Sequence, residues 1–213
     1  MDDREPDLEV ERLLHADLGV LLGGEDLSVR PSAVLDVWRI PDDAKEALSV
    51  YGLPAVPADD SFVRVGASFQ PGKEPAYAGH GTEGYVIGSC GDVSIVADVS
   101  VGSVYAVPEV REMVPALSHL HPDGVPDALI NSRVVDLVDF SWRWYWLAPL
   151  LVEQRDLADQ AEMDAWRSGG PDVDFHAPYR RLCSKVRDSF RAKDRAATST
   201  DDSMWSVMID GFE

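Results

Sequence analysis

Two histidines and an aspartate, His119, His121 and Asp123, form the most ligand-like group in the sequence, with the spacing H-x-H-x-D. Alternate residues share one face of a strand, and imidazole and carboxylate groups so placed could bind zinc. The surrounding letters, SHLHPDG, favour a turn instead, and no further His or Cys stands nearby to complete four ligands. We therefore expect no metal site here.

Cys90 and His80 could in principle act as a nucleophile and its base. Cys90 falls at a predicted hairpin turn, however, with no helix N-terminus or cationic neighbour to lower the pKa of its thiol. The glycine-rich segment Gly79–Gly84 lacks the Lys-Ser/Thr pair and the following helix of a phosphate-binding loop. Since G-x-S-x-G, CxxC and HExxH motifs are also missing from the sequence, we predict no catalytic residue and no cofactor.

The stretch Tyr85–Pro108 has an apolar pattern of period two, with turn residues at both breaks. This pattern predicts three antiparallel strands joined as a meander, at Gly84–Ser89, Asp92–Val99 and Gly102–Val107. Within the second strand, alternate residues place Ile95 and Ala97 on an apolar face that needs a cover. The sequence therefore favours an α+β fold with a central antiparallel sheet and helices packed on it.

The best cover is a helix that Asn131 or Ser132 would cap and that Pro149 would end. Its second half is apolar nearly all round, so the helix is either sandwiched between two layers or covered by a partner. We favour the sandwich, because a lobe with helices predicted at 156–167 and 179–195 follows. Two further helices are predicted earlier in the chain, at 6–22 and 42–51.

The last of these helices carries seven basic residues beside its apolar stripe: Arg180, Arg181, Lys185, Arg187, Arg191, Lys193 and Arg195. Such a helix could suggest binding to nucleic acid or to a membrane surface. The whole chain has 19 basic and 38 acidic residues, a net charge of −19. We therefore favour pairing of these bases with acids of the same chain or of a second subunit.

The net charge repels nucleic acid and anionic membranes and attracts basic partners, although it also serves solubility. The acidic first residues contain no apolar signal core, and no run reaches the roughly 18 apolar residues of a membrane span. We expect a cytoplasmic protein. Cys90 and Cys183 lie far apart in sequence, and nothing requires them to form a disulfide.

Several short motifs occur in an order that resembles the SUKH superfamily of immunity proteins, and most closely its fourth subfamily. They are Gly52-Leu53-Pro54, Ile87-Gly88, then Asp98, Gly102, Val104 and Tyr105, and finally Asn131-Ser132. The resemblance covers about residues 42–147. It implies structural roles for shared residues: backbone geometry for Gly52 and Gly102, a helix cap for Asn131, and packing for Ile87 and Tyr105.

The resemblance implies a non-enzymatic protein that binds and neutralises a cognate toxin of a bacterial polymorphic toxin system, often a nuclease or nucleic-acid deaminase. It also implies the SUKH fold. We expect residues 1–213 to form one such domain, with its core at about 25–150. The helix 6–22 would precede the core and a helical lobe, 154–213, would follow it.

An acidic inhibitor would suit a basic toxin, because charge complementarity speeds encounter. Strand parity and charge suggest the docking residues Asp92, Asp98, Glu109 and Glu112, with Trp144 or Trp146 as an aromatic anchor if exposed. Two alternatives stay open: an interaction scaffold of the same fold without a toxin, and an enzyme with an unrecognised acidic site. The oligomeric state and the toxin's identity do not follow from the sequence.

Overall fold

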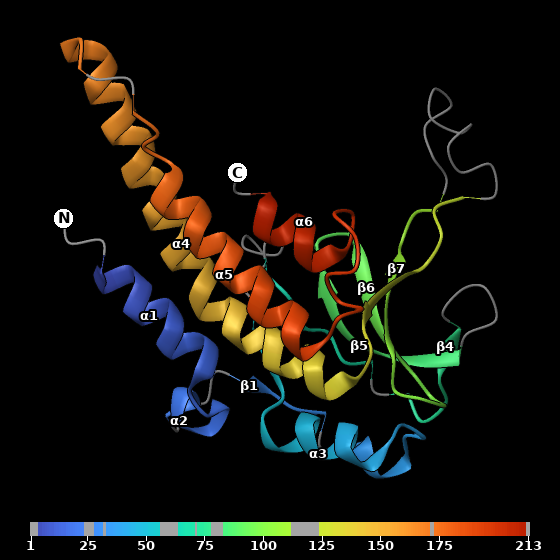
Figure 1. Ribbon diagram of the computed structural model, residues 1–213. Coiled ribbons are helices and arrows are strands. Elements are labelled where there is room, and N and C mark those ends of the chain that lie inside the picture. Colours follow the sequence, from blue (N-terminus) through green and yellow to red (C-terminus); the bar gives the residue numbers. More distant parts are fainter. Residues whose placement is uncertain are drawn as a thin grey trace.

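The computed structural model describes residues 4–23, 28–31, 33–55, 64–70, 72–77, 83–111, 124–170 and 173–211. It has an α+β fold in which helices pack on a central antiparallel sheet (Figure 1). The helices are α1 (Arg4–His15), α2 (Leu18–Leu22), α3 (Asp42–Val50), α4 (Val134–Ser168), α5 (Ala177–Lys193), α6 (Met204–Asp210) and the short 3-10 helix η1 (Leu35–Val37). No described helix is long and apolar enough to cross a membrane.

The main sheet has six strands, all paired antiparallel, in the order β3-β5-β6-β7-β8, with β4 also paired to β5. They are β3 (Gly66–Ala67), β4 (Ala76–Tyr77), β5 (Glu83–Cys90), β6 (Val93–Asp98), β7 (Val104–Pro108) and β8 (Ala128–Asn131). The short strands β3 and β4 pair with opposite ends of β5. A separate two-stranded ladder joins β1 (Ser28–Val29) to β2 (Leu53–Pro54).

The predicted meander is confirmed in β5, β6 and β7. Ile95 and Ala97 are fully buried on the inner face, as their spacing predicts. An irregularity between Val86 and Gly88 gives β5 one extra residue, Ile87, and this residue also lies in the core. The outer face is less polar than its sequence suggests, because Val86 and Val96 form a small buried cluster of their own.

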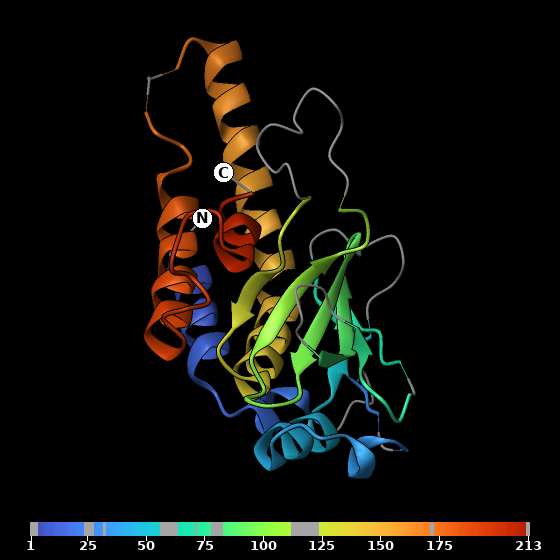
Figure 2. The same ribbon diagram turned by 90° about the vertical axis from the view of Figure 1, so that its right-hand side faces the viewer.

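The first half of α4 lies between two layers. Figures 1 and 2 show the sheet on one side of this helix, with α1 and α5 on the other and α3 below. A single hydrophobic core therefore contains side chains from the sheet, from the helices and from α4 itself. Phe140 of α4 stacks on Phe190 of α5 with ring centroids 4.0 Å apart, and Trp205 of α6 packs edge-on against both rings. The sandwich, rather than a covering partner, explains why this helix is apolar all round.

The prediction that Pro149 ends this helix is wrong. α4 runs without interruption from Val134 to Ser168 and includes the segment that the sequence suggested as a separate helix, 156–167. Pro149 cannot donate to the carbonyl of Tyr145, but its side chain is exposed and so does not disturb the core. Ala148 and Leu151 are buried on either side of the proline, and their packing holds the chain in the helix.

The N-terminal helix predicted at 6–22 is broken into α1 and α2 at Ala16 and Asp17. The Asp17 carboxylate accepts hydrogen bonds from the N–H groups of Gly19 and Val20, and it thereby begins a new helix. Gly23 ends α2 in the left-handed conformation, with φ of 57°. The predicted apolar stripe along both pieces is buried at Val10, Leu13, Leu14 and Leu18.

Candidate functional site

The acidic residues suggested for docking lie at two separate ends of the sheet. Asp92 follows β5 at its turn, and its carbonyl accepts a hydrogen bond from the Glu109 N–H, so these two exposed residues are neighbours. Asp98 lies at the other end of β6, roughly 20 Å away at about 3.3 Å per residue. Glu112 lies outside the described residues. Of the three described residues, the structure thus brings Asp92 and Glu109 together.

Asp98 stabilises the turn between β6 and β7. Its carboxylate accepts hydrogen bonds from the Ser100 N–H at 2.7 Å, the Ser100 hydroxyl at 2.5 Å and the Val101 N–H at 3.0 Å. Burial raises the pKa of Asp98, but these hydrogen bonds outweigh burial and leave the pKa below its usual value. The turn also needs Gly102, whose φ is 70° and whose carbonyl accepts the Val134 N–H at the start of α4.

The two tryptophans suggested as anchors differ in exposure. Trp144 is fully buried, so it does not meet the condition of exposure on which its suggested role depended. Trp146 is half-buried and stacks on Trp142 with ring centroids 5.5 Å apart. Sequence reasoning could not separate the two, because the helix is apolar all round in this region.

The groups considered for catalysis or metal binding are mostly not described. His80, His119, His121 and Asp123 lie outside the described residues. Cys90 is partly buried at the end of β5, and burial raises the pKa of its thiol, which disfavours the reactive thiolate. Within the described ranges, no group of three or more His, Cys, Asp or Glu side chains could hold a metal ion.

The basic helix, α5, pairs largely with acids of its own chain, as favoured from the sequence. Lys185 lies 3.0 Å from Asp7 and 2.8 Å from Glu11, both on α1, and hydrogen bonds to these acids raise its pKa. Five bases of α5 form ion pairs within the chain: Arg180, Arg181, Lys185, Arg187 and Lys193. Four of these cations fasten α5 to α1, α4 and α6, and Arg180 pairs with Asp174 just before α5.

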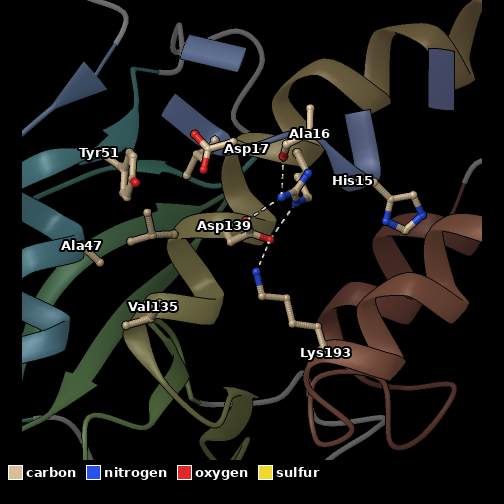
Figure 3. A pocket seen from close by; sticks show the side chains of 11 residues that line it. His15, Ala16, Asp17, Ala47, Tyr51, Val135, Asp139 and Lys193 are labelled. Carbon is tan, nitrogen blue, oxygen red and sulfur yellow. Dashed lines mark hydrogen bonds and ion pairs between the residues drawn. The ribbon is translucent and has the colours of Figure 1, made fainter. Parts of the chain in front are cut away.

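Figure 3 shows a cavity of about 350 Å³ where α1 and α2 meet α3, α4 and the end of α5. Arg143 donates to both carboxylate oxygens of Asp139, at 2.7 and 3.0 Å, and to the carbonyls of Leu13 and Ala16. Lys193 lies 2.8 Å from the same carboxylate. Arg143 therefore caps the end of α1 from the side. The facing charges satisfy one another, which favours a structural role for this cavity.

A network that the sequence did not predict fastens the C-terminal segment to the end of β8. Asp194 accepts hydrogen bonds from the Asn131 amide at 3.1 Å, the Ser132 N–H at 2.7 Å and the Ser132 hydroxyl at 2.9 Å. The side-chain Oδ1 of Asn131 in turn accepts a hydrogen bond from the Trp205 indole N–H at 3.0 Å. The prediction that Asn131 or Ser132 caps this helix is wrong, because α4 begins after Arg133 with no side-chain cap. Asp194 resembled a solvated charge in a basic run, so sequence alone gave no sign of this role.

Two further motif glycines serve close backbone packing. Gly52 has φ of 63°, and an added Cβ would lie 2.4 Å from the Val29 carbonyl oxygen. The Gly52 carbonyl accepts the indole N–H of Trp142 at 3.1 Å, which joins β2 to α4. Gly88 lies close to Gly66 of β3, where a Cβ would be 2.9 Å from the carbonyl oxygen. The implied backbone role of these motif positions therefore has a geometric basis.

These elements define an α+β protein with helices packed on an antiparallel sheet. A comparison with curated proteins and with solved structures finds no match. A comparison with family models matches the SUKH-4 immunity protein family over residues 13–211, and the chain belongs to that family. The match extends on both sides of the motif-bearing stretch 42–147 and includes α5 and α6. The resemblance drawn from the motifs is confirmed.

Proposed function

We propose that this protein is a non-enzymatic immunity protein that binds and neutralises a cognate toxin of a bacterial polymorphic toxin system. The observation that carries the proposal is the match to the SUKH-4 immunity family over residues 13–211. We further propose that the toxin is basic, with nuclease or nucleic-acid deaminase activity, and that the two proteins meet in the cytoplasm. Neither a nucleic acid nor a membrane is a partner in this account.

The distribution of charge supports a basic partner. The chain has a net charge of −19, and the bases of α5 are largely engaged with acids of the same chain. A surface of this kind repels nucleic acid and speeds encounter with cationic proteins. A toxin that binds a polyanionic substrate such as nucleic acid has a cationic binding surface. An acidic inhibitor can occupy that surface in place of the nucleic acid.

The neighbouring residues Asp92 and Glu109 are the first docking candidates that the sequence supplies. Both are exposed at one end of the sheet. Asp98 is a weaker candidate, because its carboxylate already serves the turn after β6. Glu112 and the half-buried Trp146 complete the candidate set.

The experiment is co-expression of the full chain with the product of the neighbouring gene, followed by co-purification and a growth-rescue assay. We expect a stable complex and restored growth. A variant with Asp92→Lys and Glu109→Lys tests the first docking candidates, with Asp42→Lys and Glu46→Lys on α3 as a control of equal charge change. Equal affinity for the two variants would remove Asp92 and Glu109 from the interface. Binding without any effect on growth would favour an interaction scaffold of the same fold.

A further inference from the structure

The C-terminal half of α4 extends beyond the sheet and forms, with the chain that returns into α5, a projecting helical tip (Figures 1 and 2). We define the tip as the described residues between Glu153 and His176. Trp166 near the end of α4 has 83% of its surface exposed, more than any other large hydrophobic residue in the described ranges. Met163 and Val173 of the same tip are 50% and 51% exposed. Tryptophan is enriched at protein–protein interfaces and among the residues that dominate their affinity, so this exposed indole is a candidate anchor for a partner.

The exposed apolar side chains stand among acids. Trp166 lies one helical turn from both Glu162 and Met163, and Met163 lies one turn from Asp159, so these four residues share one face of α4. The stretch 153–174 contains seven acidic and two basic residues. Both bases face acids of the tip itself: Arg155 lies 3.2 Å from Asp156, and Arg167 lies 3.5 Å from Asp164. The surroundings of Trp166 are therefore strongly negative.

The tip is braced, so it presents Trp166 from an ordered element. Gly169 ends α4 in the left-handed conformation, with φ of 65°, and the Gly170 N–H donates to the Ala165 carbonyl at 2.7 Å. On the returning segment, His176 Nε2 lies 3.4 Å from an Asp159 oxygen and 3.6 Å from a Glu162 oxygen. An anchor held on a braced helix loses less conformational entropy on binding than one on a loose loop.

We propose that this tip is the principal docking site for the toxin, with Trp166 inserted into an apolar pocket on a cationic protein surface. The inference rests on the proposed function and assigns the partner to a specific part of the chain. Charge complementarity selects this occupant, because a cationic surface gains from the acids around Trp166. A second copy of the chain would bring acid against acid, and nucleic acid would be repelled.

The test measures the affinity of the full chain for the neighbouring gene's toxin domain, made inactive by substitution of its own catalytic residue. We expect Trp166→Ala to weaken binding by roughly 30-fold or more, the loss that defines a hot spot. The matched control is Val20→Ala, because Val20 is 72% exposed on α2 at a distant part of the chain. We expect the affinity of the Val20→Ala variant for the toxin to change by less than about twofold. Thermal unfolding of both variants should match the wild type, since both side chains are largely in water.

A second pair of variants tests whether the position of the negative charges matters, because both variants remove the same number of charges from different places. Asp159→Asn with Glu162→Gln removes two charges at the tip, and Asp42→Asn with Glu46→Gln removes two from exposed positions on α3. We expect the tip variant to slow association roughly tenfold at low salt, and the α3 variant to change it by less than about twofold. The difference should shrink as salt is raised.

The outcomes distinguish the two proposals. If the wild type neither binds nor neutralises the toxin, the proposed function fails, and the tip assignment falls with it. If the wild type binds and Trp166→Ala binds equally well, the tip assignment is overturned while the proposed function stands. If Trp166→Ala instead converts a wild-type dimer to a monomer without changing toxin affinity, Trp166 serves self-association, and the assignment is again overturned.

Discussion

At the scale of single residues, the most informative finding is the structural role of Arg143, which joins α4 to the end of α1. In the sequence, Arg143 only interrupts the apolar run Phe140–Val152. In the structure its guanidinium is buried and binds Asp139 together with two carbonyls at the end of α1. A buried arginine of this kind sets where α1 stops and fixes its position against α4.

We predict that Arg143→Met lowers the free energy of unfolding by roughly 2–4 kcal/mol, because two carbonyls lose their donor and Asp139 keeps only Lys193 as a partner. Urea unfolding measures the change. The double variant Arg143→Met with Asp139→Leu should lose less than the sum of its single changes, since the two side chains interact directly in the wild type. Additive losses would contradict the view that these residues act as a pair.

A second residue-scale prediction concerns pH and Asp194. Burial raises the pKa of this carboxyl, but hydrogen bonds from Ser132, Asn131 and the Ala196 N–H leave it below the ordinary value of 3.8. Because the folded pKa is depressed, the ionised form stabilises the fold above pH 3.8, and this contribution is lost as pH falls through the folded pKa. The stability advantage of the wild type over Asp194→Asn should therefore be constant from about pH 7 to 5 and shrink toward pH 3. An advantage that is unchanged at about pH 3 would contradict this assignment.

At the scale of elements, the sequence identified segments that have strong local signals. The period-two pattern predicted β5, β6 and β7, and the stripe of Tyr179, Leu182, Val186 and Phe190 predicted the buried face of α5. The edge strands β4 and β8 were missed, because two and four residues are too short to show a period. These two strands are identified only in the structure, from their pairing with longer strands.

The long helix α4 shows where local rules fail. Proline is the strongest helix-breaking residue, yet packing on both sides of Pro149 holds one continuous helix of 35 residues. That continuity carries the second half of the helix away from the sheet and creates the tip. Exposure of Trp166 could not be predicted from sequence, because its acidic neighbourhood is equally typical of any solvated helix.

We predict that Pro149→Ala raises the free energy of unfolding by up to about 3 kcal/mol, since it restores a helical hydrogen bond at an exposed position. The matched control is Pro178→Ala in the first turn of α5, where a proline is tolerated and its removal should give no such gain. Chemical unfolding of the two variants makes the comparison. A Pro149→Ala variant less stable than the wild type would show that the helix needs a proline-induced bend.

At the scale of the whole molecule, the bases and the acids have different roles. The bases of α5 form ion pairs with acids of α1 and α4. Many acids, in contrast, stay exposed at the end of the sheet, on α3 and on the tip. A protein built this way has an ordered body and a negative exterior. Under the proposed function, this negative exterior would meet a cationic partner.

The most direct measurement of this central claim is a titration of the purified toxin's activity with the purified full chain. A protein that neutralises by occupying its partner should abolish activity in proportion to the complex formed, and inhibition should be complete near one equivalent when both concentrations exceed the Kd. Inhibition by a small fraction of an equivalent would indicate turnover by this chain. Toxin activity that persists with this protein in excess would contradict the account.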